Sequence, residues 1–148
     1  MRGPDGGPID RRRFVELGAC GAAGAALLPL AGCASLAAVR LTPEDGTLRL
    51  AVRNHPSLDR AGGHLKVAAD GVARPIYVIA QEDGSYLALS SECTHLKCTV
   101  DFEGAHIVCP CHGSTFDRSG DVLAGPAERP LNRYPAHLRD DGVLEIFL

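Results

Sequence analysis

The sequence predicts an all-β domain, built as an antiparallel β-sandwich or small barrel, behind a separate amino-terminal segment of the 148-residue chain. Three observations lead to this class. Most of the segments that alternate apolar and polar residues are four to seven residues long. Turn-forming combinations such as Asp-Gly separate them at short intervals, which is typical of sandwiches and barrels. Beyond about residue 40, no stretch shows the periodicity of a helix.

The expected strands follow one another closely. They cover residues 47–53, 64–68, 75–79, 86–89, 106–108, 122–123, 136–138 and 143–148. In the first of them, Leu48, Leu50 and Val52 recur at period two and predict a half-buried strand. We interpret residues 34–43 as a linker and residues 54–63 as a loop. The chain has no tryptophan and few other aromatic residues, so Val, Leu and Ile are expected to build the core.

Residues 1–40 are predicted to be an export signal or anchor with its linker, ahead of a domain at 41–148. Arg11, Arg12 and Arg13 precede an uncharged run rich in Ala and Gly, a pattern typical of twin-arginine signals. That route carries folded proteins, which suits a cofactor inserted before export. We therefore expect the domain at the periplasmic, extracytoplasmic face of the cell membrane. The competing interpretation is an amphipathic helix with surface arginines.

Two kinds of membrane attachment fit the same segment. Leu30, Ala31 and Gly32 before Cys33 resemble a lipoprotein cleavage box, which implies acylation of the Cys33 sulfur. Alternatively, the 23 uncharged residues between Glu16 and Arg40 could span a bilayer without being cleaved. We favour the lipid anchor because Ala and Gly dominate the run.

Two short boxes carry the chemistry. Cys93 and His95 form the first, Cys109 and His112 the second, with 13 residues between His95 and Cys109. Each box offers one thiolate and one imidazole, two or three residues apart, so together they can make a two-Cys, two-His metal site. Such a ligand set also suits tetrahedral zinc, so a structural zinc module remains the alternative. The boxes contain two further cysteines, Cys98 and Cys111.

The boxes closely resemble those of the Rieske family. C-T-H-L-K-C from Cys93 matches that family's first box, and C-P-C-H-G-S-T-F-D from Cys109 matches its second. The resemblance implies a β base with an inserted cluster-binding subdomain at about residues 92–117. It implies one 2Fe–2S cluster, with Cys93 and Cys109 on one iron and His95 and His112 on the other.

The same resemblance assigns roles around the ligands. It implies a disulfide between Cys98 and Cys111, as in the high-potential branch, and a proline loop at residues 125–127 that covers one side of the cluster. Ser114 matches the serine that donates to a bridging sulfide. Phe116 stands where the highest-potential members carry tyrosine, and Lys97 where quinol-oxidising members usually carry glycine.

The ligand set predicts a high reduction potential. Two ferric ions, two sulfides and two thiolates sum to about zero charge, whereas four thiolates would leave about −2. An electron is added more easily to a neutral centre than to a dianion. Each ligand imidazole also keeps one nitrogen free to hold or lose a proton, which couples reduction to protonation.

We therefore expect a one-electron carrier and not an enzyme by itself, because no nucleophile or acid–base pair stands beside the boxes. A net charge of −3 gives no reason to expect a nucleic-acid partner. The first expected host is a quinol-oxidising cytochrome bc-type complex. The alternative is a periplasmic molybdenum oxidase of the arsenite-oxidase kind, or a role as a free-standing carrier. The expected redox partner is a cytochrome or a molybdenum subunit.

Overall fold

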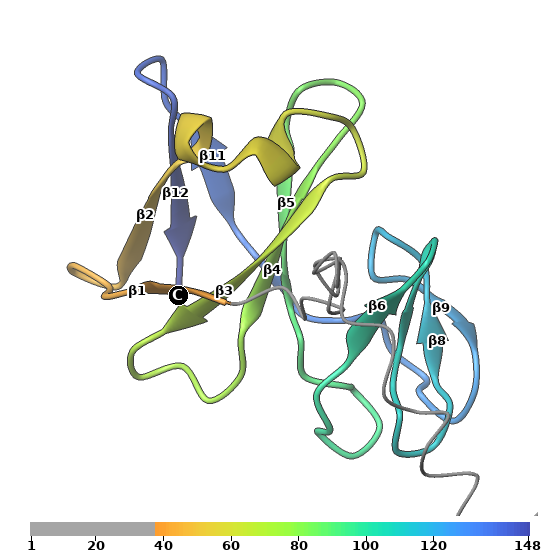
Figure 1. Cartoon of the computed structure of the whole chain (residues 1–148). Helices are drawn as coiled ribbons and strands as arrows, with labels where there is room; N and C mark the ends of the chain where they lie inside the picture. The colour runs from red at the N-terminus through yellow and green to blue at the C-terminus, as the bar shows by residue number, and fades with distance from the viewer. Residues whose placement is uncertain (1–37) are drawn as a thin grey trace, which may run out of the picture. The chain divides into compact units, whose positions relative to one another are not determined.

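The computed structural model describes residues 38–148, which form three β-sheets and two 3-10 turns (Figure 1). The prediction of an all-β domain is confirmed. The twin-arginine segment and Cys33 lie outside the described residues. Within the described part of the chain, no helix reaches the length and apolarity needed to cross a membrane.

The largest sheet has five strands in the order β1-β3-β4-β5-β10. Its strands are β1 (Val39–Leu41), β3 (His64–Ala69), β4 (Ile76–Ala80), β5 (Tyr86–Ser90) and β10 (Arg133–Tyr134). All neighbours are antiparallel except β1 and β3, which run parallel. All five residues of β4 are buried, so this central strand is covered on both faces.

A three-stranded sheet packs against the five-stranded sheet, and the residues between them form the first of two cores. It consists of β11 (Ala136–Leu138), β12 (Val143–Phe147) and β2 (Thr47–Ala51), in that order. Leu48 and Leu50 of β2 and Leu144 and Ile146 of β12 alternate inward and are at most 1% exposed. They pack against residues of β3 and β4, Ile76 and Val78 among them. The period-two pattern read from residue 47 onward therefore describes this sheet correctly.

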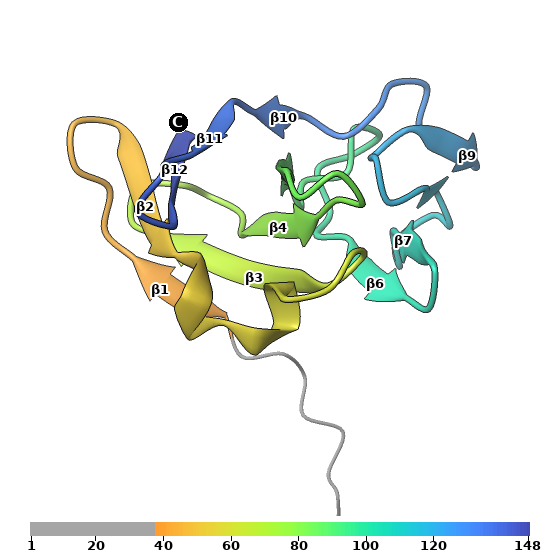
Figure 2. The same cartoon turned by 90° about the horizontal axis from the view of Figure 1, so that it is seen from above.

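The third sheet is small and belongs to the segment that carries the boxes. Its four strands are β6 (Asp101–Glu103), β7 (His106–Val108), β8 (Thr115–Phe116) and β9 (Val122–Ala124). Tyr77 and Ile79, which alternate with the first-core residues of β4, join a second core with Ile107 and Phe116. Strand β4 thus lies between two cores, as its place in the middle of Figure 2 illustrates.

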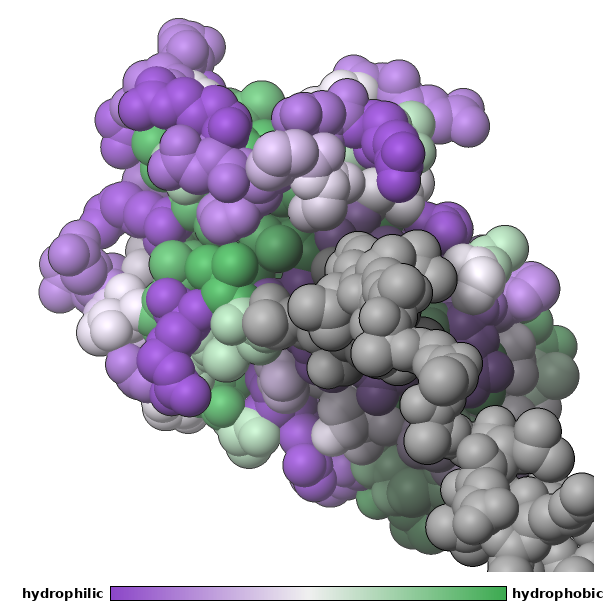
Figure 3. Space-filling view, in the orientation of Figure 1, coloured by the Kyte–Doolittle hydropathy of each residue, from purple (hydrophilic) through white to green (hydrophobic). Residues whose placement is uncertain are grey.

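Polar turns close the hairpins. Residues 81–85 connect β4 to β5, and residues 139–142 connect β11 to β12. Figure 3 shows hydrophilic side chains at the top of the view, where these two turns lie. Both turns had been expected from their Asp and Gly residues.

Three local predictions were wrong. Residues 34–43 were interpreted as a linker, but β1 lies within this range and pairs with β3. The expected strand 47–53 stops at Ala51, because Val52–Asn54 turns into a 3-10 helix whose first amide donates to Gly142. The expected loop 54–63 contains a second 3-10 turn at Pro56–Leu58, which buries Leu58. Each of these segments has three residues, too few to show a period.

Candidate metal centre

The two boxes form two loops with the same backbone pattern. In the first, the Cys93 amide donates to Cys98 C=O at 2.8 Å and the Lys97 amide donates to Cys93 C=O at 2.9 Å. In the second, the Cys109 amide donates to Ser114 C=O at 2.8 Å and the Gly113 amide to Cys109 C=O at 3.0 Å. Each loop is therefore a closed turn that begins at its first cysteine.

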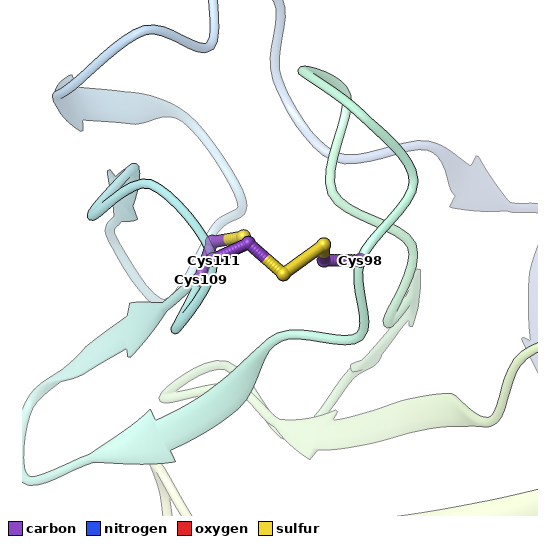
Figure 4. Close-up of side chains that lie close together, drawn as sticks. All are labelled: Cys98, Cys109 and Cys111. Atoms are coloured by element: carbon purple, nitrogen blue, oxygen red, sulfur yellow. A yellow bond between two sulfur atoms is a disulfide. The ribbon is translucent and has the colours of Figure 1, made fainter.

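A disulfide joins the two loops. Cys98 is bonded to Cys111, with their Cα atoms 6.5 Å apart. Figure 4 shows this bridge running from one loop to the other, with Cys109 beside it. The pairing expected from the resemblance is therefore present. The bridge fixes the separation of the loops, since each is already closed by its own hydrogen bonds.

The first cysteine of each loop points inward as a free thiol. Cys93 and Cys109 are each 1% exposed and belong to the second core, together with Phe116. Burial raises the pKa of the Cys93 thiol; the His95 amide and the Ser114 hydroxyl, which hydrogen-bond its sulfur, oppose that rise, and the neighbouring Cys109 adds to it. A metal ion in contact with such a thiol would deprotonate it outright.

The two box histidines lie together on the outer side of the loops. The ring centroids of His95 and His112 are 4.9 Å apart and the rings are nearly perpendicular. His95 is partly buried and His112 is exposed. Among the described residues, His95 Nδ1 is one of two buried side-chain N or O atoms without a hydrogen-bond partner; the other is Ser91 Oγ.

These features test whether the residues suit a metal group. A buried imidazole nitrogen without a partner costs free energy unless something binds it. The same two loops hold two buried free thiols, Cys93 and Cys109, which match the soft donors that iron–sulfur centres use. Two sulfurs inside and two imidazoles outside suit a cluster with unequal ligands. The residues therefore fit the group that the resemblance implies.

The segment after β9 packs on both loops. The Ala127 amide donates to Ser114 Oγ at 3.1 Å, and Thr94 Oγ1 donates to Arg129 C=O at 2.6 Å. A β-carbon on Gly125 would lie 2.5 Å from Ser114 Cα, so only glycine permits this approach. The proline loop was expected from the resemblance. The Thr94 contact was not, because nothing in the sequence links a threonine to a carbonyl 35 residues away.

Lys97 lies at the tip of the first loop. Its φ of 60° is in the left-handed region, its side chain is 80% exposed, and Nζ lies 3.7 Å from Glu92 Oε1. The neighbouring Leu96 is 61% exposed. The tip therefore presents one apolar and one charged side chain beside His95.

A second set of contacts attaches the small sheet to the large one. Tyr77 of β4 donates its hydroxyl to Asp101 Oδ1 at 2.7 Å, and Lys66 Nζ donates to the same oxygen at 2.7 Å. Burial and the Asp101 carboxylate raise the pKa of Tyr77 far above its usual range. His64 stacks on Phe102 at 3.8 Å between centroids. These contacts fix β6, and with it the first loop, against β3 and β4.

Comparisons with known proteins agree with this geometry. The family model "Rieske [2Fe-2S] domain" matches residues 50–135. The cytochrome b6-f complex iron-sulfur subunit 2 of Nostoc sp. is 36% identical over 88 residues, or 57% of this chain and 49% of that protein. The corresponding subunit of Cyanothece sp. is 38% identical over 95 residues, or 60% of this chain and 49% of that protein. The chain thus spans about half the length of the curated relatives it matches.

Solved structures share the fold. The plasma membrane Rieske protein of the cyanobacterium Synechocystis is 32% identical with a TM-score of 0.50, covering 58% of this chain and 87% of that one. A chain from the complex of reduced oxygenase and oxidized ferredoxin in carbazole 1,9a-dioxygenase is 22% identical with a TM-score of 0.52, covering 70% of this chain and 94% of that one. The second likeness concerns the fold alone.

Proposed function

Because the chain belongs to the Rieske [2Fe-2S] domain family, we propose that Cys93 and Cys109 bind one iron of its cluster, that His95 and His112 bind the other, and that the protein carries one electron at a time. A 2Fe–2S cluster held by these residues accepts and releases a single electron at a high potential. The observation that carries the proposal is the arrangement of donors: both free thiols are 1% exposed, whereas the two imidazoles meet at the surface.

The histidines have two tasks in this proposal. They bring the redox centre to the edge of the domain, where a partner protein can approach within electron-transfer distance. His112 is exposed, so its nitrogen that binds no metal can exchange a proton with water when the charge of the site changes. The thiols stay inside the second core, away from water and oxidants.

Ser114 and Phe116 are proposed to set the potential. Ser114 Oγ accepts a hydrogen bond from Ala127, so its own proton remains available to donate to sulfur. A donor to sulfur favours the more negative, reduced state and raises the potential. Phe116 packs with both free cysteines but offers no hydroxyl. We therefore propose a potential that is high, yet below that of relatives with tyrosine here.

For the host, we propose a quinol-oxidising cytochrome bc-type complex in which this chain is the iron–sulfur subunit. Relatives at 36–38% identity are named as iron–sulfur subunits of the cytochrome b6-f complex. One observation favours a soluble or molybdenum-containing partner instead: the 80% exposed side chain of Lys97 at the loop tip. A charged tip is less suited to burial in an apolar quinone pocket than glycine is.

We further propose that the domain is exported by the twin-arginine route and tethered at the extracytoplasmic membrane face, by a lipid on Cys33. Three consecutive arginines at 11–13 and the residues 30–33 support this. Intact mass of the membrane-extracted protein distinguishes the alternatives: cleavage before Cys33 with added acyl mass supports the lipid anchor, and an uncleaved chain supports a spanning segment.

Quinol oxidation by membranes tests the function. In a strain that depends on this chain, His112→Gln is expected to abolish quinol-dependent cytochrome c reduction. His137→Gln, on the exposed side of β11, is the matched control and should retain the rate. Equal rates for both variants would contradict the proposed host. If the protein in such membranes still contained iron and were redox-active, the proposal that it carries an electron would stand without this host.

A further inference from the structure

Three of the four sulfurs in the boxes lie in one group. The Sγ atoms of Cys98, Cys109 and Cys111 all lie within 4.8 Å of one another. Cys98 and Cys111 form the disulfide, while Cys109 is a free thiol (Figure 4). A thiol beside a disulfide is the arrangement from which thiol–disulfide exchange proceeds. Iron bound to Cys109 would occupy the sulfur that could attack.

We propose that Cys109 exchanges into the disulfide when no iron holds its sulfur, so that the bridge moves from Cys98–Cys111 to Cys98–Cys109. This inference rests on the proposed function, because it takes Cys109 as an iron ligand. The Cys109 sulfur forms a bond to Cys98 Sγ, and the Cys98–Cys111 bond breaks. The Cys111 sulfur leaves with the electron pair and takes up the proton that Cys109 loses. One disulfide and two free thiols are present before and after, so no oxidant or reductant is required.

The geometry selects Cys98 as the sulfur attacked. Attack on Cys111 would join two cysteines separated by Pro110 alone, which closes a very short ring with unfavourable disulfide geometry. Cys98 lies on the opposite loop and already reaches across to the second loop. The new bridge would still connect the two loops, so the tertiary fold need not open.

Exposure distinguishes the two states. Cys109 is 1% exposed, whereas Cys111 is an exposed residue. Exchange therefore replaces a buried thiol with one that reagents in solution can reach. It also removes Cys109 from the ligands, leaving Cys93, His95 and His112. Iron and sulfide could then not rebuild the site until a reductant reopened the bridge.

The test identifies which cysteines are free thiols and which are in the disulfide, starting from the wild-type, cluster-loaded protein. The two kinds of cysteine are labelled with different reagents. Iron is removed anaerobically with a chelator and without added thiol; at intervals the chain is denatured in N-ethylmaleimide, reduced and treated with iodoacetamide. Fragment masses then report which cysteines were free. At time zero we expect maleimide on Cys93 and Cys109. After iron loss we expect the Cys109 label to move to Cys111, while a sample that keeps its iron shows no change.

A second readout uses the visible spectrum. Ferrous iron and sulfide added immediately after chelation should restore the spectrum, whereas after exchange they should restore it only when a reductant is added. Persistent labelling of Cys109 after iron loss, or a bridge between Cys109 and Cys111, would overturn the inference. Failure of the proposed function would appear separately, as a starting protein without iron. The Cys93→Ser variant, prepared without iron, should still label Cys111, because Cys93 is not part of the exchange.

Discussion

Lys97 and Gly113 occupy matching places in the two loops. Each donates its amide to the carbonyl of the cysteine four residues earlier, at 2.9 and 3.0 Å, and each has a positive φ, 60° and 74°. Glycine adopts this region without cost, whereas another residue there costs about 1 kcal/mol. The second loop uses glycine for the turn, and the first loop makes the same turn with lysine.

Exchanging the residues of these two positions tests their equivalence. Lys97→Gly is expected to change the free energy of unfolding by less than about 0.5 kcal/mol, because relief of the left-handed backbone offsets glycine's greater freedom when unfolded. Its redox midpoint should shift only slightly, because the Lys97 side chain is 80% exposed and water screens its charge. Gly113→Lys should likewise change the free energy of unfolding by less than about 0.5 kcal/mol, because a β-carbon there meets nothing within 4 Å and the same two backbone effects oppose each other. A clear loss of stability in only one of the two variants in thermal unfolding would contradict the match.

Ser114→Ala should lower the redox midpoint by about 40 mV. This follows if its hydroxyl favours the reduced state by about 1 kcal/mol, which corresponds to that shift for one electron. The variant also leaves the Ala127 amide without its acceptor, so iron should be lost faster to a chelator. Ser91→Ala is the matched control, because Ser91 is equally buried and its hydroxyl has no partner among the described residues. Equal midpoints for the two variants would refute the role of Ser114.

Phe116→Tyr should raise the midpoint by about 40 mV, by adding one donor to a ligand sulfur. Phe116 is fully buried in the same cluster as Cys93 and Cys109, so a hydroxyl added to its ring enters the core that holds both thiols. Redox titration of the purified protein measures the shift. An unchanged midpoint in a protein of normal iron content would show that the ring does not tune the potential.

Gly125→Ala should displace the segment that covers the loops. Its β-carbon would lie 2.5 Å from Ser114 Cα and 2.9 Å from Gly113 O, contacts that the backbone must relieve by moving. We expect faster iron loss to a chelator by at least tenfold, because the Ala127–Ser114 hydrogen bond is broken by the same movement. Gly104→Ala controls for backbone strain, since Gly104 also has a positive φ but meets nothing within 4 Å. Similar iron loss from both variants would show that strain, and not the clash, is responsible.

The two loops and their disulfide were easier to predict from the sequence than the edges of the fold. Boxes of cysteine and histidine are visible at short range, because a loop supplies its ligands within a few residues. The alternation of Leu48 and Leu50 likewise shows the buried face of β2 directly. Strand β1 was missed because three residues, Val39 to Leu41, carry no period and pair with β3 across more than 20 intervening residues.

Long-range contacts could not be read from the sequence for the same reason. The second core places Tyr77 and Ile79 with Phe116, and Tyr77 donates to Asp101. Each of these residues is an ordinary strand residue when considered alone. The free Cys109 beside the disulfide is similar: the sequence gives the cysteine spacing, but only the folded loops place the three sulfurs together.

The most direct test of the account is the number of histidine nitrogens bound to iron. The purified protein, reduced and labelled with 15N-histidine, is to be measured by electron–nuclear double resonance, alongside iron and sulfide analysis. We expect two irons and two sulfides per chain, and couplings to two histidine nitrogens. In His112→Gln we expect one of these couplings to disappear, or the whole cluster to be lost. A colourless zinc protein, or an iron–sulfur signal without nitrogen couplings, would contradict the assignment of His95 and His112.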